Sequence, residues 1–309
     1  MNSSEQVSLR LAAPSDAAAM LGVIHAAFAH RRHVDPPPAA LGDTVADIEE
    51  SLHAGHGVCA VAGGEIVGCL LVDMHGPVAT LRRVSVLPGS AGGGLARALV
   101  EAAADLAATL GGRRVELLTR REFPELVRWW QRHGFDVLRE DAAGFILGRD
   151  LPVILDVPTA QAMRSFGGRL AGVLRAGDVL VVDGELGAGK TTLAQGVGEG
   201  LGIAGPVISP TFVISRVHRS LTDGPHLVHV DAYRLGDAAE LSDIDLDASL
   251  ADSVTYIEWG GGKAEWLAED RLEVEIWRSI DPTTDSRTLR LTGIGPRWKG
   301  ALEVLREQP

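Results

Sequence analysis

Several residue types are scarce in this chain of 309 residues, and the scarcities narrow what it can be. Cysteine occurs only as Cys59 and Cys69, ten positions apart in apolar surroundings, so we expect buried thiols in place of a disulfide or a metal site. Lysine occurs three times and arginine 26 times. A position that carries lysine is therefore a candidate for a site that needs its compact ammonium. Asparagine occurs once, as Asn2, and tyrosine twice, both in the second half of the chain.

Long hydrophobic runs are also missing. No stretch approaches the roughly 18 to 20 apolar residues needed to cross a bilayer. The opening MNSSEQVSLR lacks the basic segment followed by an apolar stretch that marks a secretory signal. Hydrophobic residues make up 46% of the chain and charged residues 23%, which is a globular composition. We therefore expect a soluble, cytoplasmic protein without membrane contact.

Basic charge is in deficit, since the net charge is −12. Residues 1–150 carry 14 arginines against 18 acids, and residues 151–309 carry 15 basic side chains against 23 acids. Proteins that grip a phosphate backbone unaided usually present a basic face. Strong binding of nucleic acid by this chain alone is disfavoured, and a nucleic-acid role would run through partners.

The length of the chain favours two domains, because single hydrophobic cores stop growing at roughly 250 to 300 residues. The segment Asp150-Leu151-Pro152 interrupts the pattern of elements, so we place the domains at 1–150 and 151–309. The first domain is predicted to be mixed α/β around a largely antiparallel sheet. Its expected strands are Val7–Arg10, Val58–Ala62, Glu65–Val72, Ala79–Val86, Val115–Thr119, Phe135–Arg139 and Gly144–Gly148, and its expected helices are Pro14–His30, Gly93–Leu110 and Pro124–His133.

In the second domain, apolar strands alternate with helices, which is typical of a largely parallel α/β sheet covered on both faces. The expected strands are Val153–Val157, Val179–Asp183, Val228–Asp231, Ser253–Glu258, Arg271–Trp277 and Thr288–Thr292. The expected helices are Thr159–Leu174 and Lys190–Leu201.

A phosphate-binding loop is predicted where the strand Val179–Asp183 meets the helix that begins at Lys190. The intervening sequence fits G-x-x-x-x-G-K-T, in which glycines let backbone N–H groups point at phosphate oxygens and the helix adds its positive end. Lys190 would contact the β- and γ-phosphates, and the Thr191 hydroxyl would bind Mg²⁺. A glycine-rich turn that carries a lysine by chance would have to coincide with both flanking elements. The predicted nucleotide-binding residues of the loop are Gly184, Glu185, Leu186, Gly187, Ala188, Gly189, Lys190, Thr191 and Thr192.

Two acidic residues end apolar strands further along the chain, Asp231 in LVHVD and Glu258 in VTYIEW. The carboxyl edge of such a sheet is where P-loop enzymes manage the metal ion or the attacking water. Common GTPases read guanine with Asn-Lys-x-Asp, and this chain has no asparagine after Asn2. A standard GTPase is therefore excluded.

The segments GELGAGKTTLAQGVGEGLG, SPTF (Ser209–Phe212), HVDAYRL (His229–Leu235) and IEW (Ile257–Trp259) resemble, in order and spacing, the TsaE family. This family is the bacterial ATPase subunit of the tRNA adenosine-37 threonylcarbamoyltransferase complex, and the resemblance covers residues 153–292. It implies ATP hydrolysis with Lys190, Asp231 and Glu258 as catalytic residues, Mg²⁺ served by Thr191 and Glu258, and Asp231 and Trp259 beside the nucleotide. It also implies a switch-like loop at Ser209, Pro210 and Thr211.

The resemblance further implies work with TsaB- and TsaD-type partner proteins, with tRNA reached only through the complex. The ATPase would reset that complex and leave the threonylcarbamoyl transfer to its partners. Asp231 and Glu258 could instead be surface acids, and Trp259 could be ordinary packing. The acidic stretch Ala239–Asp252 is either a solvated helix face or a docking surface. Asp231 and Glu258 would also fit a small-molecule or nucleoside kinase, although the SPTF and IEW segments do not belong to the kinase pattern.

In the first domain, the strand Leu81–Val86 is followed by a glycine-rich turn that opens a helix, which again places backbone N–H groups toward an anion. Together with the later WWQRHGF segment, this resembles the GNAT acetyltransferase family over residues 7–149 and implies binding of the acetyl-CoA pyrophosphate. The residues expected to bind acetyl-CoA are Val84, Val86, Ala91, Gly92, Gly93, Gly94, Leu95 and Ala96.

Two departures from the GNAT pattern concern catalysis. Ala91 stands where the family has Gln or Arg, and Trp130 replaces the Tyr that commonly protonates the departing thiolate. Residues 1–150 contain no tyrosine, so a phenol cannot act as general acid there. The nearest candidate bases are Glu116, Glu122 and His133, each of which could equally be structural. The domain is thus either an acetyltransferase for an unnamed amine or a non-catalytic CoA-binding or docking module.

Overall fold

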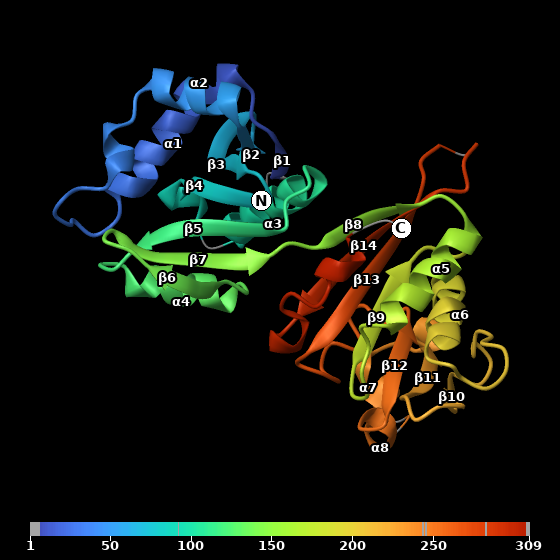
Figure 1. Cartoon of the computed structure of the whole chain (residues 1–309). Coiled ribbons are helices and arrows are strands. Elements are labelled where there is room, and N and C mark those ends of the chain that lie inside the picture. Colours follow the sequence, from blue (N-terminus) through green and yellow to red (C-terminus); the bar gives the residue numbers. More distant parts are fainter. Residues whose placement is uncertain (1–6, 92, 243, 245, 282, 307–309) are drawn as a thin grey trace. The chain divides into compact units, whose positions relative to one another are not determined.

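A computed structural model of the chain describes residues 7–91, 93–242, 244, 246–281 and 283–306. The chain divides into two compact units, Met1–Leu151 and Pro152–Pro309, and each unit is built on one seven-stranded sheet (Figure 1). In the described part of the chain, no helix combines the length and the apolar character needed to cross a membrane.

The N-terminal unit has a largely antiparallel sheet, as the sequence predicts, with strand order β1-β2-β3-β4-β5-β7-β6. Among the described strands of this unit, only β4 and β5 pair in parallel. The strands are β1 (Ser8–Leu11), β2 (His56–Ala62), β3 (Glu65–His75), β4 (Val78–Val86), β5 (Arg114–Arg120), β6 (Asp136–Glu140) and β7 (Gly144–Asp150). The helices of four residues or more are α1 (Ala17–Ala29), α2 (Val45–Ala54), α3 (Leu95–Thr109) and α4 (Pro124–Arg132), with a short 3₁₀ turn at Ala39–Gly42.

Strands β4 and β5 stay together for only three residues each. Val78–Thr80 pairs with Arg114–Glu116, and beyond these positions β4 continues to Val86 without a ladder to β5. Arg83 in β4 has a φ of 55°, a left-handed conformation that a non-glycine residue rarely adopts, and it lies where the β3–β4 register shifts. The two strands therefore separate toward their carboxyl ends, which leaves room between them for a ligand.

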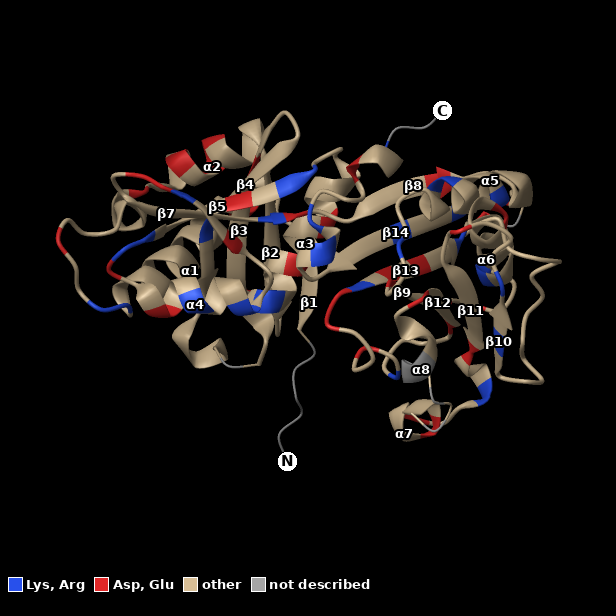
Figure 2. Cartoon of the chain, turned by 60° about the horizontal axis from the view of Figure 1, so that its bottom comes forward, with Lys and Arg blue, Asp and Glu red and all other residues tan. Residues whose placement is uncertain are grey.

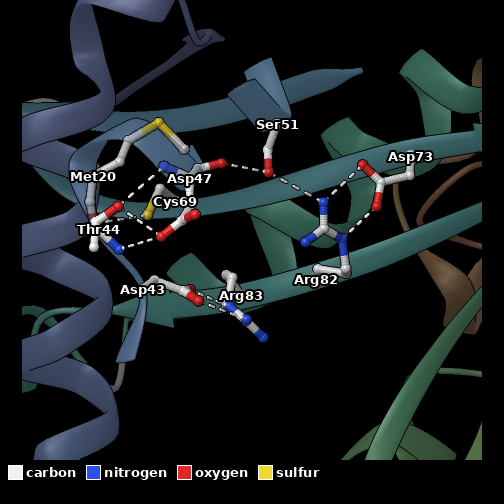
Figure 3. Close-up of polar contacts among 9 residues, drawn as sticks. All are labelled: Met20, Asp43, Thr44, Asp47, Ser51, Cys69, Asp73, Arg82 and Arg83. Carbon is white, nitrogen blue, oxygen red and sulfur yellow. Dashed lines mark hydrogen bonds and ion pairs between the residues drawn. The ribbon is translucent and has the colours of Figure 1, made fainter. Parts of the chain in front are cut away.

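Helix α2 falls in a stretch to which the sequence patterns assigned no element. Its start is fixed by a capping box, in which the Thr44 hydroxyl accepts from the Asp47 N–H (3.3 Å) and Asp47 accepts from the Thr44 N–H (2.7 Å). Ile48 and Leu52 are the buried side chains of this helix. Figure 3 shows Thr44 and Asp47 in this reciprocal contact.

The C-terminal unit has strand order β10-β11-β12-β9-β13-β14-β8. The four central strands β11, β12, β9 and β13 run parallel, as expected, while β10, β14 and β8 pair antiparallel on the flanks. The elements are β8 (Val153–Val157), α5 (Ala160–Ala171), β9 (Val179–Gly184), α6 (Lys190–Gly200), β10 (Ser215–His218), β11 (His226–Asp231), α7 (Ala238–Ser242), α8 (Asp247–Leu250), β12 (Ser253–Glu258), β13 (Arg271–Arg278) and β14 (Arg287–Ile294). The connections from β10 to β11 and from β13 to β14 are short. Parallel strands need a longer crossover, so these two pairs are antiparallel.

Both faces of this sheet are covered. Helices α5 and α6 pack together on one face, where Met163, Phe166, Leu193 and Val197 join the core. On the other face, Leu241 and Leu246 from the α7–α8 region pack against Val181, Val228 and Ile257. Strand β9 is consequently apolar throughout Val179–Val182, as expected for a strand buried on both sides.

Charged residues of both signs are interspersed along the ribbon of each unit (Figure 2). Many are paired along or across strands. Arg290 on β14 contacts Glu275 on β13 at 2.8 Å, and Arg271 contacts Glu273 at 2.8 Å. These pairs occupy part of the basic side chains, so the acidic excess of the sequence remains in the fold.

Candidate functional site

The glycines of the loop between β9 and α6 give it a backbone that other residues cannot adopt easily. Gly187 and Gly189 have φ values of 76° and 112°. A Cβ at Gly184 would lie 2.5 Å from the carbonyl oxygen of Ile276 on β13, so the loop passes too close to that strand for any side chain. Arg287 at the start of β14 donates from Nε to the Ala188 carbonyl at 3.1 Å and supports the loop from outside.

Lys190 begins helix α6 and folds back over the loop. Its side chain is buried, with the residue only 5% exposed, and Nζ donates to the carbonyl oxygens of Gly184 (2.6 Å) and Glu185 (3.0 Å). The pKa of the Lys190 ammonium is lowered, because the effect of burial exceeds the opposing effect of three nearby carboxylates. Those carboxylates belong to Glu258, Asp183 and Asp231. A compact ammonium is therefore held against the backbone of the glycine loop.

The two acids predicted at strand ends lie side by side at the carboxyl edge of the sheet. Asp231 pairs with Glu258 in the β11–β12 ladder, and Glu258 pairs with Val182 of β9. Glu258 is 3% exposed and accepts a hydrogen bond from the Thr191 hydroxyl at 2.9 Å. Thr191 and Glu258, which come from separate elements, thus present their oxygens together.

Two further residues of this edge were missed by the sequence reasoning, His229 and Tyr256. His229 Nε2 lies 2.9 Å from Glu258 Oε1 and is fully buried, and the Tyr256 hydroxyl donates to the Lys190 carbonyl at 2.7 Å. The two rings meet edge to face, 5.5 Å apart. A usable signal was present, because residues two apart on a strand share a face. His229 therefore lies on the side of Asp231, and Tyr256 on the side of Glu258.

Asp231 ties the predicted switch loop to β11. Its Oδ2 accepts from the hydroxyls of Ser209 (3.0 Å) and Thr211 (2.5 Å), and its Oδ1 accepts from the Tyr233 N–H (3.0 Å). Pro210 lies between the two hydroxyl residues, and its carbonyl accepts from the N–H of Val213 at 2.8 Å. Both carboxylate oxygens are already engaged, so Asp231 is arranged to hold this loop.

Trp259 follows Glu258 in a strained conformation, with a φ of 60°. Its N–H donates to the Val182 carbonyl at 2.9 Å, and its ring lies 3.5 Å from Lys190 Nζ and 5.1 Å from the Tyr233 ring. The turn brings the indole against the ammonium, where a cation–π contact stabilises it.

These groups fit a nucleoside triphosphate with Mg²⁺. The first N–H groups of α6 have no partner within the helix and face the loop, which suits phosphate oxygens. The Thr191 hydroxyl and the Glu258 carboxylate are hard oxygen donors, and Mg²⁺ is usually held by one or two such groups together with phosphates. The N–H groups at the loop thus suit the phosphates, and the oxygen donors beside it suit the metal ion.

A second candidate site is a cavity of about 530 Å³ in the N-terminal unit, between the separated ends of β4 and β5. Val84, Val86 and Ala96, predicted to bind acetyl-CoA, line it. Gly94 caps α3 with a φ of 76°, and Ala91, Gly93 and Leu95 lie in the turn and first residue that lead into this helix. Gly92 lies outside the described residues.

Trp130 lines this cavity and is buried against Trp129 and Phe135, with ring centres 4.7 and 4.9 Å away. The three candidate bases do not line it. Glu116 pairs with Arg139 and Glu122 with Arg120 at 2.9 and 2.6 Å. His133 stacks on Trp129, and its Nδ1 lies 2.7 Å from the Trp129 carbonyl oxygen.

The C-terminal strand, glycine loop and helix, beside two acid-ended parallel strands, define a P-loop nucleotide-binding domain. Residues 157–287 match the sequence model of the family described as "Threonylcarbamoyl adenosine biosynthesis protein TsaE". The chain belongs to this family. Residues 26–135 match the model described as "Acetyltransferase (GNAT) family", so a GNAT-like domain precedes the TsaE domain.

Proteins similar to the C-terminal unit have the same family description. The tRNA threonylcarbamoyladenosine biosynthesis protein TsaE of Streptomyces coelicolor is 60% identical over 141 residues, which cover 45% of this chain and 95% of that protein. Its counterpart in Bacillus subtilis is 39% identical over 137 residues, covering 44% and 82%.

Solved structures resemble each unit. A crystal structure of Bacillus subtilis YdiB, 31% identical, covers 50% of this chain and 93% of its own, with a TM-score of 0.41. A PaiA N-acetyltransferase of Thermoplasma acidophilum, in complex with coenzyme A, is 14% identical and covers 47% of this chain and 99% of its own, with a TM-score of 0.43.

Proposed function

We propose that the C-terminal unit is a Mg²⁺-dependent ATPase that supports synthesis of threonylcarbamoyladenosine at position 37 of tRNA, in the cytoplasm. The observation that carries the proposal is the convergence of Lys190, Thr191 and Glu258 beneath a glycine loop. The similarity to proteins named for this biosynthesis supports the pathway.

The roles of the residues follow from their positions. Lys190 and the loop N–H groups would bind the phosphates and stabilise the charge that develops on the transferring phosphoryl group. Thr191 and Glu258 would hold Mg²⁺, which, when bound, neutralises charge on the β- and γ-phosphate oxygens. His229 would hold the Glu258 carboxylate in its orientation through the contact between Nε2 and Oε1. Trp259 would cover the site from the side of Lys190.

The partners belong to the same proposal. Both halves of the chain are acidic, so tRNA would be reached through TsaB- and TsaD-type proteins and not by this chain directly. Asp231 ties the loop Ser209–Pro210–Thr211 to β11 through two hydroxyls. A change at the γ-phosphate could therefore alter this loop and, through it, a bound partner.

The ATPase proposal is tested by hydrolysis assays on three variants of the full chain. We expect Lys190→Ala and Glu258→Gln each to lower turnover roughly 100-fold or more, since each removes a charge that acts on the phosphates or their metal. Lys299→Ala, at an exposed lysine outside the site, is the matched control and should hydrolyse ATP at the wild-type rate. Wild-type turnover by Lys190→Ala would overturn the proposal.

A second candidate function concerns the N-terminal unit, which we propose binds acetyl-CoA and transfers its acetyl group to an amine. The cavity between β4 and β5 and the adjoining start of α3 favour it, because they offer an apolar slot that ends at free helix N–H groups. Calorimetry with acetyl-CoA tests the binding, and Ala96→Trp, which fills the slot, should abolish it. Binding without transfer to any amine would instead favour a non-catalytic module.

A further inference from the structure

The charged residues that line the N-terminal cavity are all of one sign. Its lining includes four arginines, Arg31, Arg82, Arg83 and Arg120, and no aspartate, glutamate or lysine among the described residues. The remaining wall is largely apolar and aromatic. Phe28, Phe123, Trp129 and Trp130 are its aromatic members. An apolar cavity with a few convergent charges is the usual form of a small-molecule site.

Two of the four arginines, Arg82 and Arg83, are each paired with an aspartate, as Figure 3 shows. Arg82 contacts Asp73 through Nε and through Nη2 (3.0 Å to Oδ1), and Arg83 contacts Asp43 at 2.5 and 2.9 Å. These are bidentate pairs, in which the carboxylate satisfies the guanidinium fork. Both charges are therefore already used within the fold.

Arg120, on β5, is the third arginine whose charge is satisfied. Its Nη2 lies 2.6 Å from Glu122 Oε1, and its Nη1 donates to the Pro36 carbonyl at 2.7 Å. A ligand would have to compete with these partners for the guanidinium. Arg120 is therefore not the free charge of the cavity.

Arg31, just after α1, differs from the other three. Its Nη2 donates to the Val84 carbonyl at 3.2 Å, and its guanidinium lies 3.9 Å from the centre of the Phe28 ring. No described carboxylate forms an ion pair with it, and burial lowers the pKa of its guanidinium. A guanidinium has five N–H donors, so most of those of Arg31 are available to a ligand.

We propose that the acetyl acceptor of this cavity is a small amine that also carries a carboxylate, which Arg31 binds. The inference rests on the proposed acetyl-transfer function and names its substrate class. A partly buried cation without an anion is costly, and a ligand carboxylate would relieve that cost. The planar guanidinium matches a carboxylate in two parallel hydrogen bonds, while the aromatic wall accepts the apolar part of the ligand.

The transfer step balances without a further reagent. The neutral amine nitrogen attacks the thioester carbonyl carbon, the new C–N bond forms, and the C–S bond breaks. Coenzyme A leaves as the thiolate, which takes up the proton that the nitrogen loses. Because no described aspartate, glutamate or histidine lines the cavity, that proton would pass through water. Arg31 orients the acceptor and takes no part in proton transfer.

The test compares amino acids with their own amides as acceptors, with acetyl-CoA and the full chain. The panel is the common amino acids, each paired with its carboxamide, and the readout is kcat/KM for coenzyme A release. We expect at least one carboxylate to be preferred over its amide roughly 10- to 100-fold, the range for a hydrogen bond to a charged group. Arg31→Ala should remove that preference by weakening the carboxylate alone.

Arg32→Ala is the matched control, because Arg32 is the next residue, is exposed and does not line the cavity. It should keep the wild-type preference. Arg31→Lys retains the positive charge but not the planar guanidinium, and it should show an intermediate preference. This variant replaces Arg31→Ala in the test if Arg31→Ala does not fold. Equal rates for every acid and its amide, or an unchanged preference in Arg31→Ala, would overturn the inference.

Acetyl-CoA binding is measured in the same samples, so that the two proposals can fail separately. If acetyl-CoA does not bind, the acetyl-transfer proposal fails, and binding of the amino acids is then followed directly by calorimetry. Carboxylate binding that depends on Arg31 would in that case still support the anion site. Acetyl-CoA binding with no acceptor preference, or with no member of the panel accepted, would overturn the inference alone.

Discussion

At the scale of single residues, His229 is the most consequential side chain that the sequence patterns did not single out. It is fully buried, and its Nε2 lies 2.9 Å from the carboxylate oxygen of Glu258 that also accepts from Thr191. A carboxylate that is already hydrogen-bonded to a neighbouring side chain has a fixed orientation. It therefore loses little side-chain entropy when it binds a metal ion. His229 is thus a positioning residue for the proposed magnesium site.

We expect His229→Ala to raise the Mg²⁺ concentration needed for half-maximal ATP hydrolysis by roughly 10- to 100-fold, because Glu258 loses one of its two side-chain partners. His229→Gln keeps a donor of similar reach and should lose less. His226→Ala, at the start of the same strand, is the control, and its Mg²⁺ dependence should equal that of the wild type. An unchanged Mg²⁺ dependence in His229→Ala would show that His229 only packs.

The two cysteines give a prediction about pH. Burial raises the pKa of Cys59 to about 11 and also raises that of Cys69. At pH 8 a thiol with a pKa of about 11 is roughly one part in a thousand thiolate, so neither should react with an aromatic disulfide reagent while the protein is folded. The reaction is followed by absorbance, with the urea-unfolded chain as the reactive control. Rapid modification of the native chain at pH 8 would contradict the burial.

The same shifts act on stability. Because the folded-state pKa lies above the unfolded value of about 9, the neutral thiols favour the folded state fully below that pH. This contribution is lost as the pH rises through about 11. The thermal midpoint of the N-terminal unit should fall over this window, and the fall should be smaller in the double variant Cys59→Ala/Cys69→Ala.

Which site residues could be predicted depended on whether they carry a local signature. Lys190 and Thr191 belong to a contiguous motif, and Glu258 ends an apolar strand, so the sequence alone indicated them. Their roles remain predictions. Arg31 had no such signature, because most residues that line the cavity with it come from β4, β5 and α4, far along the chain. Only the folded arrangement reveals that no described carboxylate pairs with its charge.

At the scale of elements, helices α5 and α6 approach each other most closely at glycines. A Cβ at Gly167 would lie 2.6 Å from the Leu193 carbonyl oxygen and 2.8 Å from Gly196 Cα. A Cβ at the adjacent Gly168 would meet nothing nearer than 3.9 Å. Helix α6 begins with Lys190, so this contact also fixes the helix that carries the loop residues.

We expect Gly167→Ala to lower the free energy of unfolding by about 1–3 kcal/mol, because the helices must move apart. Gly168→Ala, one residue away, should be neutral or stabilising by up to about 1 kcal/mol, since alanine favours helix. Thermal unfolding of the full chain, followed through the transition of the C-terminal unit, checks both. Equal effects of the two substitutions would mean that the close approach does not matter.

Elements with a strong pattern were the ones that could be predicted. The buried strand Val179–Val182 and the helix after the glycine loop were evident in the sequence, whereas α2 and β10 were not assigned. The region of α7 and α8 was interpreted only as a solvated helix face or a docking surface, over Ala239–Asp252. Strand β10 is a flanking strand of four residues with two exposed positions, so it has little hydrophobic pattern. Which flanking strands run antiparallel was also not indicated, since direction follows from connections that periodicity does not report.

At the scale of the whole molecule, the chain divides into Met1–Leu151 and Pro152–Pro309, each with its own sheet and core. The similar Streptomyces coelicolor protein is covered over 95% of its length by 141 residues of this chain. A unit with its own core is able to fold alone. The N-terminal unit is therefore not needed to complete the core of the C-terminal unit.

We expect the fragment 152–309 to be folded, as judged by circular dichroism, and to hydrolyse ATP at the rate of the full chain. The fragment 1–151 should in turn bind acetyl-CoA without ATPase activity. An unfolded C-terminal fragment would show that the first unit stabilises the second. A folded fragment with altered turnover would show that the two activities are coupled.

The measurement that tests the central claim most directly is multiple-turnover formation of threonylcarbamoyladenosine on tRNA, reconstituted with TsaB- and TsaD-type partners and ATP. With the wild-type chain we expect modification to continue well beyond one tRNA per partner complex. With Lys190→Ala, or with no chain added, it should stop near one turnover. Continued modification without this chain, or full support from the Lys190→Ala variant, would contradict the account.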